Sequence, residues 1–180
     1  MLRPFAGYER LARLQGDEAP TVTAGATRLL LAIGGTVALT ATGRLAPFEL
    51  LGAMISFSYV PLVQIASVGV VLRLFAPKVP FRRAYALYLV GLGPWLLLFC
   101  GIAATCLFAP HVARAIPALI VAMWIAYGWG IVLTCAWMRK ALALSWRKTI
   151  GAMLLLYTVV HAIVLGYFLA AGQLWPILPW

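Results

Sequence analysis

The sequence predicts an all-α integral membrane protein, in which a short amphipathic helix precedes a bundle of five transmembrane helices. Hydrophobic residues make up 64% of the 180 residues and charged residues only 10%, whereas a soluble domain carries about a quarter of its residues as charged ones. The apolar stretches recur at about the 20 residues that one helical crossing of a bilayer requires. The basic residues between them alternate between many and few, as the connections of a membrane protein do.

Residues 2–14, with the sequence LRPFAGYERLARL, are the first predicted helix. Spaced at about 100° per residue, its apolar and basic side chains fall on different sides. The apolar side consists of Phe5, Tyr8, Leu11 and Ala12, and the basic side of Arg3, Arg10 and Arg13. We expect this helix to lie on an anionic cytoplasmic leaflet, with docking onto a protein partner as the alternative. Residues 1–26 then form a cytoplasmic N-terminal segment.

Five apolar stretches follow within residues 27–172 and predict the transmembrane domain. The predicted spans are about 29–43, 50–72, 84–108, 115–138 and 150–172. The first is long enough to cross only if it recruits Thr27 and Arg28, whose long side chain can reach the interface. Residues 173–180 contain Trp175 and Trp180, so we expect this tail to lie along the outer interface.

The distribution of basic residues predicts the orientation of the five spans. In chain order, the segments outside the spans carry 4, 1, 4, 1, 4 and 0 lysines and arginines. The positive-inside rule places the segments with four on the cytoplasmic side. The N-terminus is therefore expected inside and the C-terminus outside. The Ala-, Arg- and Leu-rich composition favours the cytoplasmic (inner) membrane of a bacterium.

The third span contains a predicted irregularity. Pro94 lies about ten residues into it and has no backbone N–H to donate to the preceding turn. We therefore expect a kink near residues 90–91. In the connection before this span, Pro77 and Pro80 favour extended backbone.

The ionisable residues exclude several function classes. The carboxylates Glu9, Asp17, Glu18 and Glu49 all lie away from the centre of any predicted span, whereas proton relays place such groups inside the bundle. No phosphate-binding loop or hydrolase motif is present either, so we do not expect an enzyme. The basic residues are too dispersed to form a nucleic-acid surface.

His161 is the one ionisable residue near the middle of a predicted span. It could ligate haem or bacteriochlorophyll axially, or hydrogen-bond to Tyr157, Thr158 or a neighbouring helix. A second axial ligand has few candidates, because His111 falls at a different depth. The remaining candidates are methionines, which are ordinary core residues: Met123, Met138 and Met153.

The small residues and the polar residues of the predicted spans each suggest a further role. Ala162, Gly166 and Ala170 form a small-xxx-small face, which suits close packing within the bundle or docking of another protein. Ser56, Gln64 and Ser67 are expected to hold helices together by hydrogen bonds. The alternative is a polar pathway of Gln64, His161 and the break at Pro94, which would indicate a small transporter or lipid-handling protein.

Two stretches carry a resemblance to a known family. The basic turn FRRAYALY followed by LVGLGPWLLL, and the later MRKALALSWRKTIGAMLLL, resemble the Yip-domain family of Rab-GTPase-interacting membrane proteins and their prokaryotic relatives. The matching positions are Phe81, Arg82, Arg83, Ala84, Gly91, Gly93 and Pro94. The resemblance implies five spans with the N-terminus inside. It also implies a scaffold or accessory subunit, with a membrane protein or a second copy as its partner in the lipid bilayer.

Overall fold

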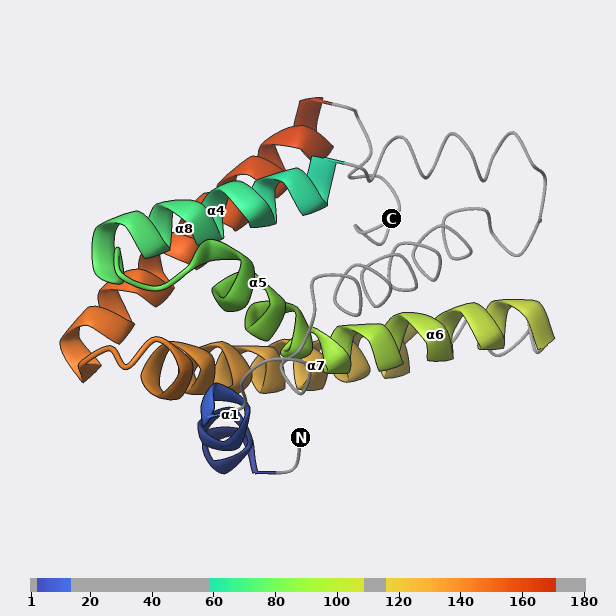
Figure 1. Ribbon diagram of the computed structural model, residues 1–180. Coiled ribbons are helices and arrows are strands. Elements are labelled where there is room, and N and C mark those ends of the chain that lie inside the picture. The colour runs from blue at the N-terminus through green and yellow to red at the C-terminus, as the bar shows by residue number, and fades with distance from the viewer. Residues whose placement is uncertain (1–2, 14–58, 109–115, 171–180) are drawn as a thin grey trace.

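The computed structural model describes residues 3–13, 59–108 and 116–170, and the regular structure in these ranges is entirely helical (Figure 1). The helices are α1 (Pro4–Arg13), α4 (Tyr59–Phe75), α5 (Phe81–Val90), α6 (Gly93–Phe108), α7 (Ile116–Ala136), the π-helix η3 (Trp137–Ala141) and α8 (Trp146–Ala170). The all-α prediction is confirmed for this part of the chain. The predicted span 29–43, the first part of 50–72, His111, Ser56 and the tail 173–180 lie outside the described residues.

The helices form two packed pairs joined by a short one. Helices α4 and α8 lie side by side, as do α6 and α7. Helix α5 runs between the two pairs, contacting α4 on one side and η3 on the other (Figure 1). Helix α1 packs on α7 and η3, at the end where α7 passes into α8. The predicted N-terminal helix is therefore present, and it lies against the chain's own bundle.

Where the sequence predicts a kink in the third span, the helix is interrupted completely. Helix α5 ends at Val90, a turn follows at Gly91 and Leu92, and α6 starts at Gly93 in a new direction (Figure 1). Pro94 cannot donate to the carbonyl of Val90. The N–H groups of Gly91 and Leu92 instead bond three residues back, to Tyr88 at 2.9 Å and to Leu89 at 3.1 Å. The predicted span 84–108 thus consists of two helices.

Helix α7 ends in a π-helical turn that the sequence pattern did not predict. The N–H of Leu142 donates to the carbonyl of Trp137 at 3.1 Å, and the N–H of Leu144 reaches Met138 at 3.1 Å. Between them Ala143 adopts a positive φ of 53°. The turn lets the chain reverse within four residues before α8 starts, where the N–H of Lys148 points to the Ser145 hydroxyl at 3.5 Å.

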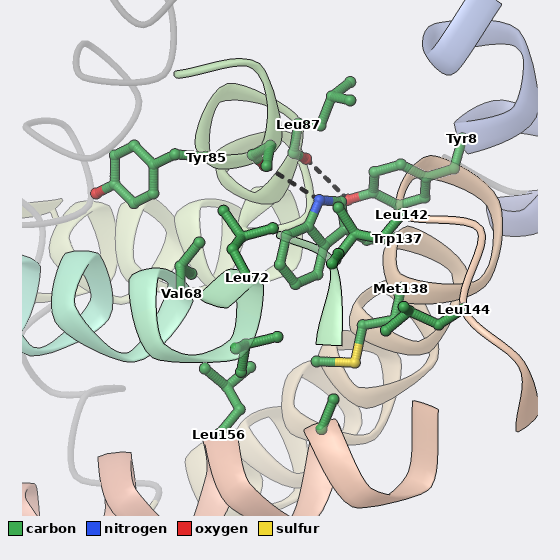
Figure 2. Close-up of a cluster of buried hydrophobic side chains, with 14 of the residues drawn as sticks. Tyr8, Val68, Leu72, Tyr85, Leu87, Trp137, Met138, Leu142, Leu144 and Leu156 are labelled. Atoms are coloured by element: carbon green, nitrogen blue, oxygen red, sulfur yellow. Dashed lines mark hydrogen bonds between the residues drawn. The ribbon is translucent and has the colours of Figure 1, made fainter. Parts of the chain in front are cut away.

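The core lies where α1, α4, α5, η3 and α8 meet. Its largest fully buried side chains are Trp137, Tyr8, Leu89, Met138, Val68 and Val71. Figure 2 shows the Trp137 indole and the Tyr8 phenol approaching α5, with Leu72 and Leu156 packed below them. Tyr8 therefore anchors the N-terminal helix in the same apolar cluster that holds the longer helices together.

One helix among the described residues, Ile120–Ala141, is long and apolar enough to cross a membrane by length and composition. A shorter apolar helix covers Leu62–Phe75. Large apolar side chains remain exposed on α4, α7 and α8: Leu62, Trp124, Ile125 and Leu154 are 65%, 64%, 67% and 64% exposed. Such a surface suits an apolar environment better than water.

Candidate functional site

The first candidate site lies where the N-terminal helix meets the broken third span. In a continuous helix, the carbonyl of Leu87 would accept a hydrogen bond from the N–H of Gly91. That N–H instead bonds to Tyr88, because the helix ends there. The hydroxyl of Tyr8 donates to the Leu87 carbonyl at 3.2 Å. A side chain from α1 thus supplies the donor that the break removes.

The close approach of Tyr8 explains why a glycine stands at position 91. A Cβ on Gly91 would lie 2.6 Å from the Tyr8 hydroxyl oxygen and 3.1 Å from the carbonyl oxygen of Tyr88. The first of these distances is too short for any side chain to be added without displacing Tyr8. Gly91 therefore permits the helix to end and the N-terminal helix to dock.

Trp137, like Tyr8, donates a side-chain hydrogen bond to a backbone carbonyl of α5. Its indole Nε1–H donates to the carbonyl of Ala84 at 3.1 Å, and its ring meets the Tyr88 ring edge-on with centroids 5.2 Å apart. Ala84 lies three residues before Leu87 on α5. Side chains from η3 and α1 therefore bond to two carbonyls about one turn apart on the same helix, as the dashed lines in Figure 2 show.

Charged contacts surround the buried Tyr8. The Glu9 carboxylate lies 3.2 Å from Lys140 and 2.6 Å from Arg13, and the Arg83 guanidinium donates to the carbonyl of Ala12 at 2.5 Å. Lys140, and then Arg13, hold the pKa of the Glu9 carboxyl below its ordinary value. Burial raises the pKa of Tyr8, which keeps its hydroxyl a neutral donor.

The N-terminal helix packs in a way that neither sequence-based hypothesis described. The leading expectation placed its apolar side on lipid, and the alternative placed it on a protein partner. In the structure Tyr8 is buried, and Phe5 and Leu11 pack against the core. This side of the helix therefore docks on the chain's own bundle.

The second candidate site surrounds His161 on α8. Its Nδ1 lies 2.6 Å from the carbonyl oxygen of Tyr157, and its Nε2 lies 3.1 Å from the hydroxyl of Tyr127 on α7. A carbonyl oxygen only accepts, so Nδ1 carries the hydrogen and Nε2 accepts from Tyr127. The Tyr157 hydroxyl in turn donates to Thr134 at 3.3 Å. The expected hydrogen bonds to Tyr157 and to a neighbouring helix are both present.

Aromatic rings enclose the Tyr127 side of this cluster. Tyr127 packs edge-on against His161, Tyr157, Trp95 and Trp124, with centroid separations between 5.6 and 6.3 Å. Tyr157 stacks on His161 at 5.7 Å. The cluster therefore joins α6, α7 and α8 through rings and hydrogen bonds.

The donor set of His161 has one feature expected of a ligand. Ligating histidines usually donate the other ring N–H to a carbonyl or carboxylate, as Nδ1 does here to Tyr157. Nε2 is engaged by Tyr127, so ligation of haem or bacteriochlorophyll requires that hydroxyl to turn away. Among the proposed second ligands, Met138 is fully buried in the core and Met153 packs against that core.

The remaining predicted site residues are spread over several elements. Ala162 and Gly166 are exposed on α8, and a Cβ on Gly166 would meet nothing within 4 Å, while Ala170 ends the helix. Pro94 lies in the first turn of α6, and Arg82 is exposed at the start of α5. The side-chain oxygens of Gln64 and Ser67 are buried without a hydrogen-bond partner in the described part of the chain, so the expected adhesive bonds are not observed there.

Three contributing residues were not singled out from sequence. Trp137 is fully buried and bonds to α5, and no sequence pattern marked it as part of a site. Tyr127 and Thr134 lie seven residues apart, a spacing that places them on one face of α7. This polar pair on an otherwise apolar helix is the signal that could have identified the partner face of His161. No family model, no curated protein and no solved structure matches this chain.

Proposed function

We propose that this chain is an integral membrane protein that acts through contacts with other proteins, as a scaffold or accessory subunit. The proposal includes five spans with the N-terminus in the cytoplasm, and the bacterial inner membrane as the location. The resemblance of the FRRAYALY and MRKALALSWRKTIGAMLLL stretches to Yip-domain proteins supports it. A membrane protein partner or a second copy of the chain would complete the assembly.

The observation that carries this proposal is the outward surface of α7, the helix long enough to cross a membrane. Its exposed large apolar residues are Ile120, Val121, Met123, Trp124, Ile125 and Trp129. On α8 the exposed Ala162 and Gly166 leave room for another helix backbone to approach closely. The polar groups of Tyr8 and Trp137 in the core bond within the chain, and so does the exposed His161.

Purification in a mild detergent followed by native mass spectrometry tests this proposal. We expect a reproducible protein partner, or a homo-oligomer, bound through the small-residue face of α8. Gly166→Leu should then release it, because the longer side chain keeps the helices apart. Gly101→Leu is the matched control, since its Cβ position is equally open and lies on α6, outside the α7 and α8 surfaces named above. A stable, partnerless monomer would contradict the proposal.

The Nδ1–H bond of His161 favours a second candidate function, an accessory subunit that binds haem or bacteriochlorophyll. The absorption spectrum of gently purified protein tests it. A Soret or near-infrared band that His161→Gln abolishes would support this function, and Tyr127→Phe should keep the band because it frees Nε2. The complete absence of such a band would exclude it.

A further inference from the structure

The basic residues of the described chain fall into two groups according to their contacts. One group bonds within the molecule: Arg13 and Lys140 to Glu9, Arg83 to Ala12, and Arg139 to the Leu144 carbonyl and the face of Trp146. The other group has exposed side chains that make no hydrogen bond or ion pair to another described residue. Its members after α1 are Arg73, Lys78, Arg82, Arg147 and Lys148, which we name the basic rim.

Three of the five rim residues come from two helix starts with the same residue order. Helix α5 begins with Phe81–Arg82–Arg83, and α8 begins with Trp146–Arg147–Lys148. In each, an aromatic residue precedes two basic ones, and the aromatic side chain is exposed, 40% for Phe81 and 56% for Trp146. Neither first turn contains an acidic residue. The positive ends of the two helix dipoles add to the same field.

Packing places the rim at one end of the α4–α8 pair. The Phe75 ring at the end of α4 lies 3.6 Å from the position of a Cβ on Gly151 of α8, and the Phe81 ring lies 3.8 Å from that of Gly69 on α4. The connection before α5 therefore lies beside the first turns of α8 (Figure 1). Glu9, the one carboxylate among the described residues, is already paired with Arg13 and Lys140.

The surface next to the rim identifies the kind of partner. Leu74 and Ile150 lie within three residues of rim residues and are 64% and 56% exposed. A single partner must therefore neutralise cations and also cover apolar side chains beside them. A phospholipid does both, because its phosphate and its acyl chains meet at this boundary, where Trp and basic side chains are favoured. An acidic protein segment offers the charge without the apolar part.

We propose that the basic rim binds the headgroups of anionic phospholipids in the leaflet that it faces. Arg82 and Arg147 donate to phosphate oxygens, Lys78 and Lys148 add charge, and the rings of Phe81 and Trp146 lie at the boundary with the acyl chains. This inference rests on the proposed membrane location. It adds lipid selectivity, which a membrane location alone does not require.

Lipid association in liposomes tests the inference. The full chain is reconstituted in mixed phosphatidylglycerol and phosphatidylcholine, and spin-labelled versions of the two lipids report their relative association by electron paramagnetic resonance. We expect a preference for phosphatidylglycerol that weakens in high salt. The double variant Arg82→Gln/Arg147→Gln should reduce it by up to roughly five-fold for each charge removed.

Three controls make the outcomes decisive. The double variant Arg3→Gln/Arg10→Gln removes the same charge from exposed positions near and on α1. It should keep the preference for phosphatidylglycerol. An equal loss of preference would contradict lipid binding by the rim. Arg82→Lys/Arg147→Lys should largely retain selectivity. Inorganic phosphate, at matched ionic strength, should displace no more lipid than chloride does, and stronger displacement would indicate a free-anion site instead. A chain that enters liposomes without any lipid preference overturns this inference only, whereas a chain that does not insert overturns the proposed function.

Discussion

The hydroxyl of Tyr8 donates to the backbone carbonyl of Leu87 at 3.2 Å, across 79 residues of sequence. The acceptor is free because α5 ends at Val90, and Pro94 is the residue that prevents the helix from continuing. The N-terminal helix and the broken span therefore form one unit, in which a side chain of the first satisfies the backbone of the second. A substitution in either part should therefore affect the stability of the other.

Removal of the Tyr8 hydroxyl should destabilise the protein. Tyr8→Phe keeps the ring in the core but leaves the buried Leu87 carbonyl without this donor, which costs about 1–3 kcal/mol. Thermal or denaturant unfolding in detergent measures the change. Tyr85→Phe is the matched control, because the buried Tyr85 hydroxyl has no hydrogen-bond partner among the described residues, and its loss should be neutral or slightly stabilising. Equal effects of the two variants would contradict the role of Tyr8.

Gly91 and Gly93 should respond differently to alanine. Gly91→Ala places a Cβ 2.6 Å from the Tyr8 oxygen and should destabilise by about 1–3 kcal/mol through overpacking. Gly93→Ala meets nothing within 4 Å, and at the first residue of α6 it should change stability by no more than about 0.5 kcal/mol. The same unfolding measurement compares them.

A double-mutant cycle shows whether the Gly91 effect acts through Tyr8. In Tyr8→Phe the clashing oxygen is absent, so Gly91→Ala should cost clearly less than it does beside tyrosine. Additive effects would show that the added methyl group acts elsewhere.

Docking of α1 should weaken at acidic pH. The folded-state pKa of Glu9 is lowered, by Lys140 first and then by Arg13, from an ordinary value of 4.5. A group with a lowered pKa contributes stability above its ordinary pKa and loses that contribution as the pH falls through the folded-state value. Amide-exchange protection of α1, corrected for intrinsic rates, should decline over that range. Glu9→Gln should show weaker protection at neutral pH and no such decline, so a profile like that of the native chain would refute the assignment.

Ala143 should tolerate glycine better than a helical alanine does. Its φ of 53° lies in the left-handed region that glycine adopts without strain. We expect Ala143→Gly to be neutral or to stabilise by up to about 1 kcal/mol. Ala66→Gly, at an exposed position within α4, should destabilise by about 1 kcal/mol. Melting temperatures of the two variants provide the comparison, and a large loss at Ala143 would contradict it.

The sequence predicted the features that depend only on residues close together in the chain. Pro94 alone indicated an irregular third span near residues 90–91, and the periodicity of residues 2–14 indicated the amphipathic helix, which the structure contains as Pro4–Arg13. Lys78 lies in the turn between α4 and α5, and Lys148 lies in the first turn of α8. Each of these predictions needs only a few consecutive residues.

Contacts between distant residues could not be predicted in the same way. That the Leu87 carbonyl needs a donor follows from the break, but that Tyr8 supplies it depends on where α1 packs. The indole of Trp137, the first residue of η3, bonds to Ala84, which lies 53 residues earlier. Likewise the Nε2 partner of His161, Tyr127, lies on another helix. Sequence periodicity specifies a face of a helix but not the helix that it meets.

The long sequence separation of these bonds has a consequence for the order of synthesis. The chain makes α1 first, yet Leu87 follows Tyr8 by 79 residues and Lys140 follows Glu9 by 131. At 5–20 residues per second, the Lys140 contact becomes available roughly 7–26 s after Glu9 is made. During that interval the docking surface of α1 is incomplete, because η3 has not yet been made. The first helix to be made thus gains its full set of contacts only after most of the chain has followed it.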